Sequence, residues 1–169
     1  GLARLLAQSG CEAVDLGDDV QATTNGGVPP IGLCGSGLID LAAELLRKGM
    51  LQSQGLVVAR DALPGSLAPA LRDRVVEHAE GTAFVLARAD ETRSGRPLLL
   101  TQRDVRELQL ATGAIRAGIS ILLKRANLEP AQLDRVHVGG GFGNYIRLVN
   151  AQRIGLLPEA LREDQFSFV

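Results

Sequence analysis

The sequence contains no tryptophan, and its four phenylalanines and single tyrosine make up only 3% of the 169 residues. Aromatic platforms on which nucleic-acid bases stack are therefore not expected. The formal net charge at neutral pH is −1, so the charge balance does not favour nucleic acid or an acidic lipid surface. No apolar run approaches the roughly 20 residues that a membrane-spanning helix requires. These absences predict a protein that binds neither nucleic acid nor a membrane.

Cysteine and histidine are equally scarce. Cys11 and Cys34 form neither a CxxC pair nor a metal-binding spacing. Two isolated cysteines in a chain of this length are typical of a reducing compartment, which predicts a cytoplasmic protein. His78 and His137 are isolated too, and neither paired carboxylates nor a Ser/His/Asp set accompanies them. We therefore predict no metal site, and the sequence leaves the catalytic residues unassigned.

What remains is an ordinary globular composition, with 46% hydrophobic and 22% charged residues. The chain is long enough to form one domain with a full hydrophobic core. It has no signal peptide, and it opens on Gly1 in the middle of an apolar pattern rather than on a methionine. We therefore expect residues 1–169 to form a single α/β lobe of a longer protein.

Hydrophobic periodicity predicts the first helix over residues 37–48, where apolar residues recur at helical spacing. Ser36 is the predicted N-cap, and Gly49 is the predicted stop at the C-terminal end. Short strands broken by turns are expected over 13–31. A strand over 54–59 is expected to follow the helix.

A short helix is predicted within 66–79. A β-hairpin and then a long helix are predicted to follow it. The segments 82–88 and 96–101 predict the hairpin strands, and Thr101 with Asp104 forms a capping-box variant at the start of the helix. The helix has one apolar stripe, and its small residues would let another backbone approach closely. The apolar stripe consists of Val105, Leu108, Ile115, Ile119 and Leu122. The small residues are Ala111, Gly113, Ala114 and Gly118.

The remaining elements complete an α/β order. We expect a strand over 135–138, a glycine turn, a helix over 147–153 and a strand that begins at Gln165. The order of strands, helix, hairpin, long helix, strand and helix predicts a mixed sheet with helices packed on it.

The glycine turn in "VHVGGGFGN" is the strongest candidate site in the sequence. A strand, a glycine-rich turn and a helix together aim backbone N–H groups at an anion or a nucleotide. Gly139, Gly140 and Gly141 have no Cβ, so a ligand could lie directly on the backbone. The spacing matches neither G-x-G-x-x-G nor the P-loop. The residues alone therefore leave two interpretations open, contact with a ligand and a tightly packed turn.

Two weaker motifs lie closer to the N-terminus. Gly35, Ser36 and Gly37 precede the first predicted helix, where free N–H groups favour an anion, although an ordinary N-cap explains them as well. Asp15-x-Gly17 superficially resembles the D-x-G phosphate loops of actin-like kinases. The acidic residues that follow, at 18 and 19, would repel a phosphate. We therefore exclude this motif as a phosphate loop.

Three segments together resemble a known family. They are "PPIGLCGSGLIDLAAELLRKGM", "TQRDVRELQLATGAIRAGISILL" and "VHVGGGFGNYIRLVNAQRIGLLP". They are similar to the C-terminal part of the ATP-dependent reductive activators of corrinoid proteins, over about residues 29–158. The resemblance implies a lobe of the ribonuclease H-like, actin-like ATPase fold.

The resemblance also implies an activity for the full-length protein. ATP binding and hydrolysis, with Mg²⁺, would drive an electron from a 2Fe-2S cluster in a ferredoxin-like domain to an inactive cobalt(II) corrinoid protein of a methyltransferase system. This chain would supply the adenosine-binding lobe. The cofactor-binding residues that the resemblance implies are Gly139, Gly140, Gly141 and Phe142 at the turn, Gly35, Ser36 and Gly37 at the cleft, and Glu107 and Gln109 on the long helix.

Three departures from the family pattern shape the expectation. Thr112 stands where the family has a lysine, no D-x-G phosphate loop is found, and the cluster cysteines of the ferredoxin domain are absent. Because hydrolysis needs Mg²⁺ and positioned phosphates, we expect this lobe alone not to hydrolyse ATP. The alternative is a non-catalytic actin-like module that docks a partner or forms a homodimer, in which the glycines serve only packing.

Overall fold

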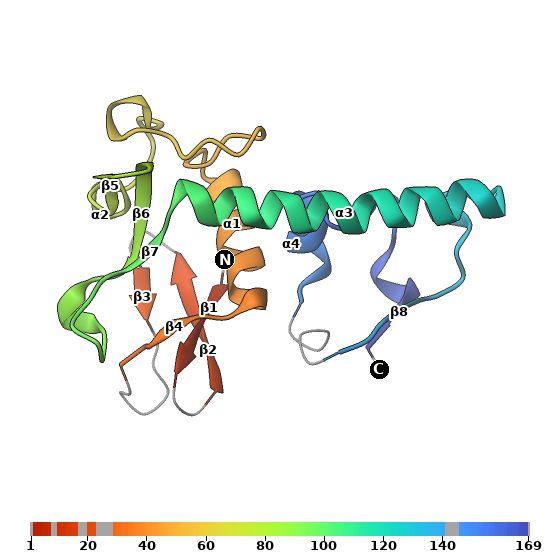
Figure 1. The fold of residues 1–169 in the computed structure, drawn as a ribbon, viewed down its shortest axis with the longest axis horizontal. Coiled ribbons are helices and arrows are strands. Elements are labelled where there is room, and N and C mark those ends of the chain that lie inside the picture. Colours follow the sequence, from red (N-terminus) through yellow and green to blue (C-terminus); the bar gives the residue numbers. More distant parts are fainter. Residues whose placement is uncertain (1, 8–9, 17–19, 23–28, 141–145, 169) are drawn as a thin grey trace.

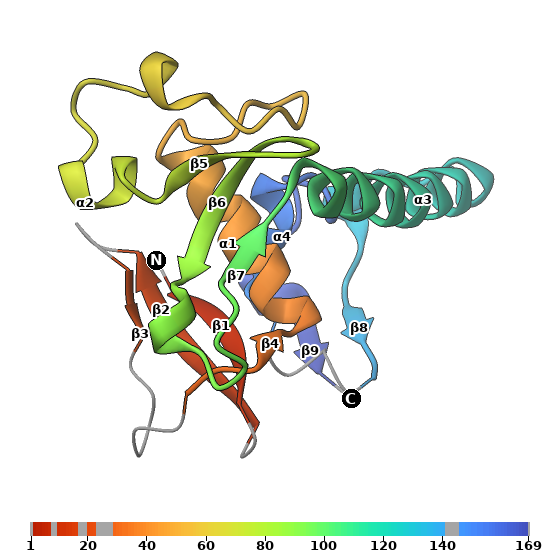
Figure 2. The same ribbon diagram turned by 60° about the vertical axis from the view of Figure 1, so that its left-hand side comes forward.

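The computed structural model describes residues 2–7, 10–16, 20–22, 29–140 and 146–168 (Figure 1). Helix α1 occupies the centre of the fold, with an antiparallel sheet on one side and helix α4 on another (Figure 2). The long helix α3 extends past these elements towards the C-terminal part of the chain (Figure 1). No helix in the described part of the chain combines the length and apolar character needed to span a bilayer.

The N-terminal sheet is antiparallel and has the strand order β3–β2–β1–β4. Leu2 pairs with Asp15, and Leu5 pairs with both Glu12 and Leu33. The strands predicted over 13–31 are confirmed in their described parts, but the prediction missed the first strand. The four strands are β1 (Leu2–Ala7), β2 (Gly10–Leu16), β3 (Val20–Ala22) and β4 (Gly32–Leu33).

Helix α1 (Gly35–Arg47) confirms the first predicted helix and corrects its start. The N-cap residue is Cys34, whose carbonyl oxygen accepts the first helical hydrogen bond from Leu38 at 2.9 Å. Ser36 is therefore not the N-cap. Its hydroxyl is buried within the first turn, 3.3 Å from the Cys34 thiol. At the other end Gly49 has a φ of +70°, as expected of a C-terminal stop.

A segment rich in turns connects α1 to a small antiparallel sheet. The strand predicted over 54–59 is wrong, because only a single bridge joins Leu51 to Val57. The hairpin is confirmed in a sheet of order β5–β6–β7. This part contains α2 (Pro69–Arg72), β5 (Val75–His78), β6 (Gly81–Ala87), β7 (Leu98–Leu100) and the 3₁₀ turns Arg60–Ala62 and Ala89–Glu91.

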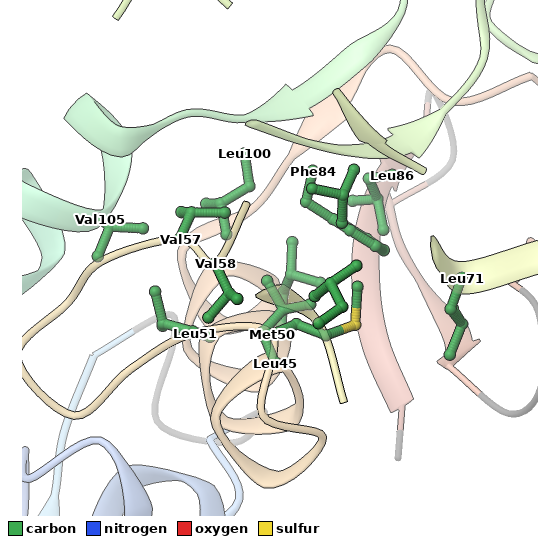
Figure 3. Packing of buried hydrophobic residues seen from close by; sticks show 14 of the residues in the cluster. Leu45, Met50, Leu51, Val57, Val58, Leu71, Phe84, Leu86, Leu100 and Val105 are labelled. Carbon is green, nitrogen blue, oxygen red and sulfur yellow. The ribbon is translucent and has the colours of Figure 1, made fainter. Parts of the chain in front are cut away.

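The main hydrophobic core lies between α1, the turn segment, this second sheet and the first turn of α3 (Figure 3). Leu41 and Leu45 of α1 belong to the same cluster as Phe84 of β6, and all three residues are fully buried. Full burial of a leucine or phenylalanine contributes roughly 1.5–3 kcal/mol. The core therefore fixes α1 against the elements that follow it.

Helix α3 (Gln102–Ala126) has its described buried residues, Gln102 and Val105, at its N-terminal end. The predicted capping box is confirmed, because Thr101 and Asp104 each accept a hydrogen bond from the other's backbone N–H. Of the apolar stripe, only Val105 is buried, whereas Leu122 is 68% exposed. Of the small residues, neither Gly113 nor Gly118 has a described atom within 4 Å of the position that a Cβ would occupy, so no described segment of this chain makes the expected close approach there.

The C-terminal part returns beneath α3. Strand β8 (Val136–Val138) pairs in parallel with β9 (Phe166–Phe168), and α4 (Leu148–Arg153) lies between them in sequence. The predicted strands and helix of this part are therefore confirmed. The amide of Gln165 donates a hydrogen bond to the Leu133 carbonyl, and 3₁₀ turns occur at Pro130–Gln132 and Glu163–Gln165.

Candidate functional site: a groove between α1 and α4

A groove of about 600 Å³ lies between α1 and the segment that runs from Ile146 into α4. Helix α1 contributes Glu44 and Arg47 to one wall. The opposite wall continues from Ile146 into α4. Its lining residues there are Ile146, Arg147, Leu148, Val149, Asn150 and Arg153, and Glu163 with Phe166 complete it. The described wall of the groove thus begins at Ile146, five residues after the last glycine of the motif at 139–141 in the sequence.

Glu44 is the centre of the charged groups in the groove. Its side chain is only 4% exposed and accepts a 2.8 Å hydrogen bond from Nε of Arg47. Nη1 of Arg153 lies 3.7 Å from its other carboxylate oxygen. Burial alone would raise the pKa of Glu44, but the Arg47 hydrogen bond and the charges of Arg47 and Arg153 outweigh it and lower this pKa. Glu44 is therefore ionised at neutral pH.

A buried hydrogen bond joins the two walls of the groove. Nδ2 of Asn150, on α4, donates to Oδ1 of Asp40, on α1, at 2.6 Å. Asp40 is 0% exposed and Asn150 is 5% exposed. Nη1 of Arg153 also donates to the side-chain Oδ1 of Asn150 at 3.4 Å, which connects this pair to the Glu44 cluster. The position of α4 relative to α1 is therefore set by polar contacts, in addition to packing.

The glycine turn begins at the end of β8, where Gly139 and Gly140 are both exposed. Gly140 has a φ of +103°, a region that side chains rarely adopt, so the backbone itself requires glycine there. No described atom lies within 4 Å of the place where its Cβ would be. Gly141 and Phe142, which were predicted to contact the adenosine, lie outside the described residues.

The second glycine motif occupies the start of α1. Gly35 is exposed, whereas Ser36 and Gly37 are buried. Ser36 and Glu44 are eight residues apart on α1, which corresponds to about 12 Å along the helix axis. Helix α1 therefore carries both this motif and the acidic wall of the groove.

The predicted residues on α3 lie elsewhere. Glu107 is exposed, and the Gln109 amide donates a 3.0 Å hydrogen bond to the Gln54 carbonyl. Gln109 lines a different cavity, between α1 and α3, and neither residue lines the groove. The structure thus places the α3 candidates apart from the segment that follows the glycine turn.

Sequence reasoning missed the polar residues of the groove. Asp40 and Glu44 are one helical turn apart, among the buried residues Leu41, Ala42 and Leu45. Two acidic residues on the buried face of a helix are unusual and need partners. That pattern could have identified them from the sequence, whereas nothing local marks Asn150 and Arg153 as their partners.

The chemistry of the groove suits an anionic ligand that also carries hydroxyl groups. Guanidinium groups bind phosphate oxygens or stack on planar bases. A carboxylate such as that of Glu44 accepts hydrogen bonds from hydroxyl groups. The groove presents three arginines, Arg47, Arg147 and Arg153, against two glutamates.

Comparisons with known proteins agree with the architecture. The sequence profile of the C-terminal ASKHA domain of RACo matches residues 6–169. The corrinoid activation enzyme RamQ of Eubacterium limosum is 34% identical over 160 residues, which cover 94% of this chain and 26% of RamQ. The chain thus spans about a quarter of the length of this relative.

A solved structure matches as well. A reductive activator for a corrinoid, iron-sulfur protein superposes with a TM-score of 0.77 at 34% identity, over 99% of this chain and 24% of that protein. The match supports an actin-like fold for the arrangement around α1 and α3. Since the profile covers almost the whole chain, the protein belongs to the family defined by the C-terminal ASKHA domain of RACo, a domain of corrinoid reductive activators.

Proposed function

We propose that this chain is the adenine-nucleotide-binding lobe of an ATP-dependent reductive activator of a corrinoid protein, and that the groove between α1 and α4 takes the nucleotide. One observation carries the assignment of the site. One wall of the groove begins at Ile146, a few residues after the glycine turn in the chain, and the groove is lined by arginines and a buried, ionised glutamate. Family membership supports the activity of the whole protein.

The residues present fit a magnesium nucleotide in type. Arg47, Arg147 and Arg153 would meet the phosphates or the purine face, and Glu44 would accept hydrogen bonds from the ribose hydroxyls. Gly140 leaves open the space that a side chain would fill. In the whole protein, hydrolysis of the nucleotide would supply the free energy for an uphill electron transfer.

The partners follow from the names of the relatives, which activate corrinoid proteins. We infer that the whole protein passes an electron from a 2Fe-2S domain to a cobalt(II) corrinoid protein of a methyltransferase system, in the cytoplasm. This chain would contribute nucleotide binding and the conformational response to it. We expect the chain alone to show no ATP hydrolysis above that of the variant Gly140→Asp.

An amide NMR titration of the chain with Mg-ADP tests the nucleotide site. We expect saturable shifts at Gly139, Gly140, Glu44 and Arg153. The variant Gly140→Asp should abolish them, because it adds a side chain and a negative charge to the glycine turn, on which we propose that the nucleotide also lies. Gly81→Asp is the matched control, since Gly81 also has a positive φ, +110°, and open space around its Cβ position, but lies in a hairpin far from the groove in sequence and in the fold.

Two results would contradict the assignment. Shifts confined to residues outside the groove would place the nucleotide elsewhere on the lobe. Equal loss of binding in the Gly140 and Gly81 variants would show that backbone strain, and not a blocked site, explains the effect. A repeat with a corrinoid protein present would then show whether the nucleotide changes the affinity for that partner.

Exposed apolar side chains on α3 support a second candidate function. Leu110 is 69% exposed, Ile121 is 55% exposed and Leu122 is 68% exposed. Large apolar side chains at this exposure on one helix favour docking of a partner or a homodimer. Light scattering across a concentration series tests the homodimer, and Leu122→Gln should dissociate it. A monomer at all concentrations would exclude this alternative for the isolated chain.

A further inference from the structure

A second cavity lies between α1, the 51–55 turn, α3 and the end of α4. It shares no lining residue with the α1–α4 groove. Its volume is about 250 Å³. The floor is apolar and consists mainly of Leu46, Leu51, Leu108 and Ile154, while Gln52 and Thr112 add polar groups. A cavity of about 150 Å³ is enough to hold benzene, so the space suits an organic molecule that contains a ring.

One charged group lines this cavity, the guanidinium of Arg116. Its Nη1 atom is buried and has no hydrogen-bond partner among the described residues. No carboxylate is found among the described lining residues. A buried N–H group without an acceptor is costly. Arg116 as a whole is half-buried, and its Nη1 is the part that lacks an acceptor among the described residues. An anionic group in the cavity would supply that acceptor.

Gly113 lines the cavity from the middle of α3. No described atom lies within 4 Å of the position that its Cβ would occupy. The helix backbone is therefore open to a molecule in the cavity at this point.

We propose that this cavity binds a compact organic monocarboxylate with an apolar, ring-sized body. The carboxylate would accept hydrogen bonds from Arg116, and the body would lie on the leucine floor beside Gly113. A single guanidinium can pair with a carboxylate through two parallel bonds, and the apolar floor matches a ring-sized body.

The position of the cavity gives such a ligand a structural effect. The 51–55 turn is fastened to α3 by two glutamines two helical turns apart. Gln102 donates to the Gly55 carbonyl at 2.6 Å and accepts from the Val57 N–H at 3.0 Å, and Gln109 donates to Gln54. A ligand in the cavity would touch α1, this turn and α3 at once. It would therefore stabilise their mutual arrangement.

Three simple probes test the proposal on the full chain by amide NMR titration. Benzoate has the ring and the carboxylate, benzamide has the ring without the charge, and acetate has the charge without the ring. We expect saturable shifts at Gly55, Thr112 and Gly113 with benzoate, at least tenfold weaker binding of benzamide, and no saturable binding of acetate. This comparison requires no variant.

Two pairs of variants locate the site. Arg116→Gln should weaken benzoate binding at least tenfold, whereas Arg106→Gln, which removes an exposed arginine of the same helix outside the cavity, should leave it unchanged. Gly113→Leu should fill the cavity and abolish binding. Gly118→Leu is its control, because Gly118 is equally open but does not line the cavity.

The result that overturns the proposal is specific. Equal binding of benzoate and benzamide, or benzoate binding that Arg116→Gln leaves intact, would show an apolar hollow without anion recognition. Absence of any saturable shift would overturn it as well. The nucleotide site is tested separately, because ADP titration of Gly113→Leu should still shift the residues of the α1–α4 groove.

Discussion

The hydrogen bond between Asn150 and Asp40 provides the sharpest test of how the α1–α4 groove is held together. The change is Asn150→Ala, which removes the amide that donates to the buried carboxylate at 2.6 Å. Because α4 forms one wall of the groove, this bond also positions that wall against α1. Its loss should therefore affect both stability and the groove.

The magnitude follows from burial and charge. A hydrogen bond to a charged group contributes about 1.5–3 kcal/mol. Asp40 is 0% exposed, so water cannot replace the lost donor without opening the interface. We expect Asn150→Ala to lower the free energy of unfolding by about 2–4 kcal/mol. In an Asp40→Asn background the same change should cost about 1 kcal/mol, because only an amide loses its partner.

The assay is a double-mutant cycle measured by urea unfolding and circular dichroism at one pH. A coupling energy of at least about 1 kcal/mol is expected between these two contacting residues. The reasoning is refuted if Asn150→Ala costs the same in both backgrounds, since the Asp40 carboxylate would then not be what Asn150 stabilises. A cost below about 0.5 kcal/mol in the wild-type background would likewise show that the interface opens to water.

Three further predictions concern stability. Gln102→Leu leaves two backbone groups of the 55–57 segment unpaired and should lower the free energy of unfolding by about 2–5 kcal/mol. Gln109→Leu loses one exposed hydrogen bond and should lower it by less than about 1 kcal/mol. Equal losses in urea titrations would contradict the burial argument. The lowered pKa of Glu44 stabilises the folded state fully above its ordinary pKa of 4.5, and this stabilisation is lost as pH falls towards the lower pKa of the folded state. Glu44→Gln should therefore flatten the acid side of a plot of stability against pH. An unchanged acid side would refute this. Thr101→Ala removes the N-cap of α3 and should cost about 1 kcal/mol in thermal unfolding, and an Asp104→Ala variant that already lacks the reciprocal bond should lose less from the same change.

Local signals in the sequence predicted the elements that depend on local chemistry. The capping box at Thr101 and Asp104, the hairpin and the stop at Gly49 all follow from residues within a few positions of one another. The start of α1 could not be predicted in the same way. Ser36 has the right chemistry for an N-cap, but burial beside the Cys34 thiol places it inside the first turn.

The candidate site shows the same division. The glycines at 139 and 140 stood out because glycine itself carries the signal. The partners across the groove come from positions about 110 residues apart, as the bond between Asp40 and Asn150 shows. Only the three-dimensional packing of α1 against α4 brings them together, so one sequence without relatives cannot reveal the pair. The failed strand over 54–59 has a similar origin, because Gln102 pairs the backbone groups at Gly55 and Val57.

The length of helix α3 would turn a small tilt at its N-terminal end into a larger displacement at its C-terminal end. Its 25 residues span about 37 Å at 1.5 Å per residue, yet its buried residues, Gln102 and Val105, lie in its first turn. A tilt of about 5° at that fixed end would carry the far end through about 3 Å. Ten residues beyond the far end the chain enters β8, and the glycines at 139 and 140 follow that strand. A small tilt where α3 meets α1 and the 51–55 turn would therefore be larger at the end of α3 from which the chain runs to these glycines.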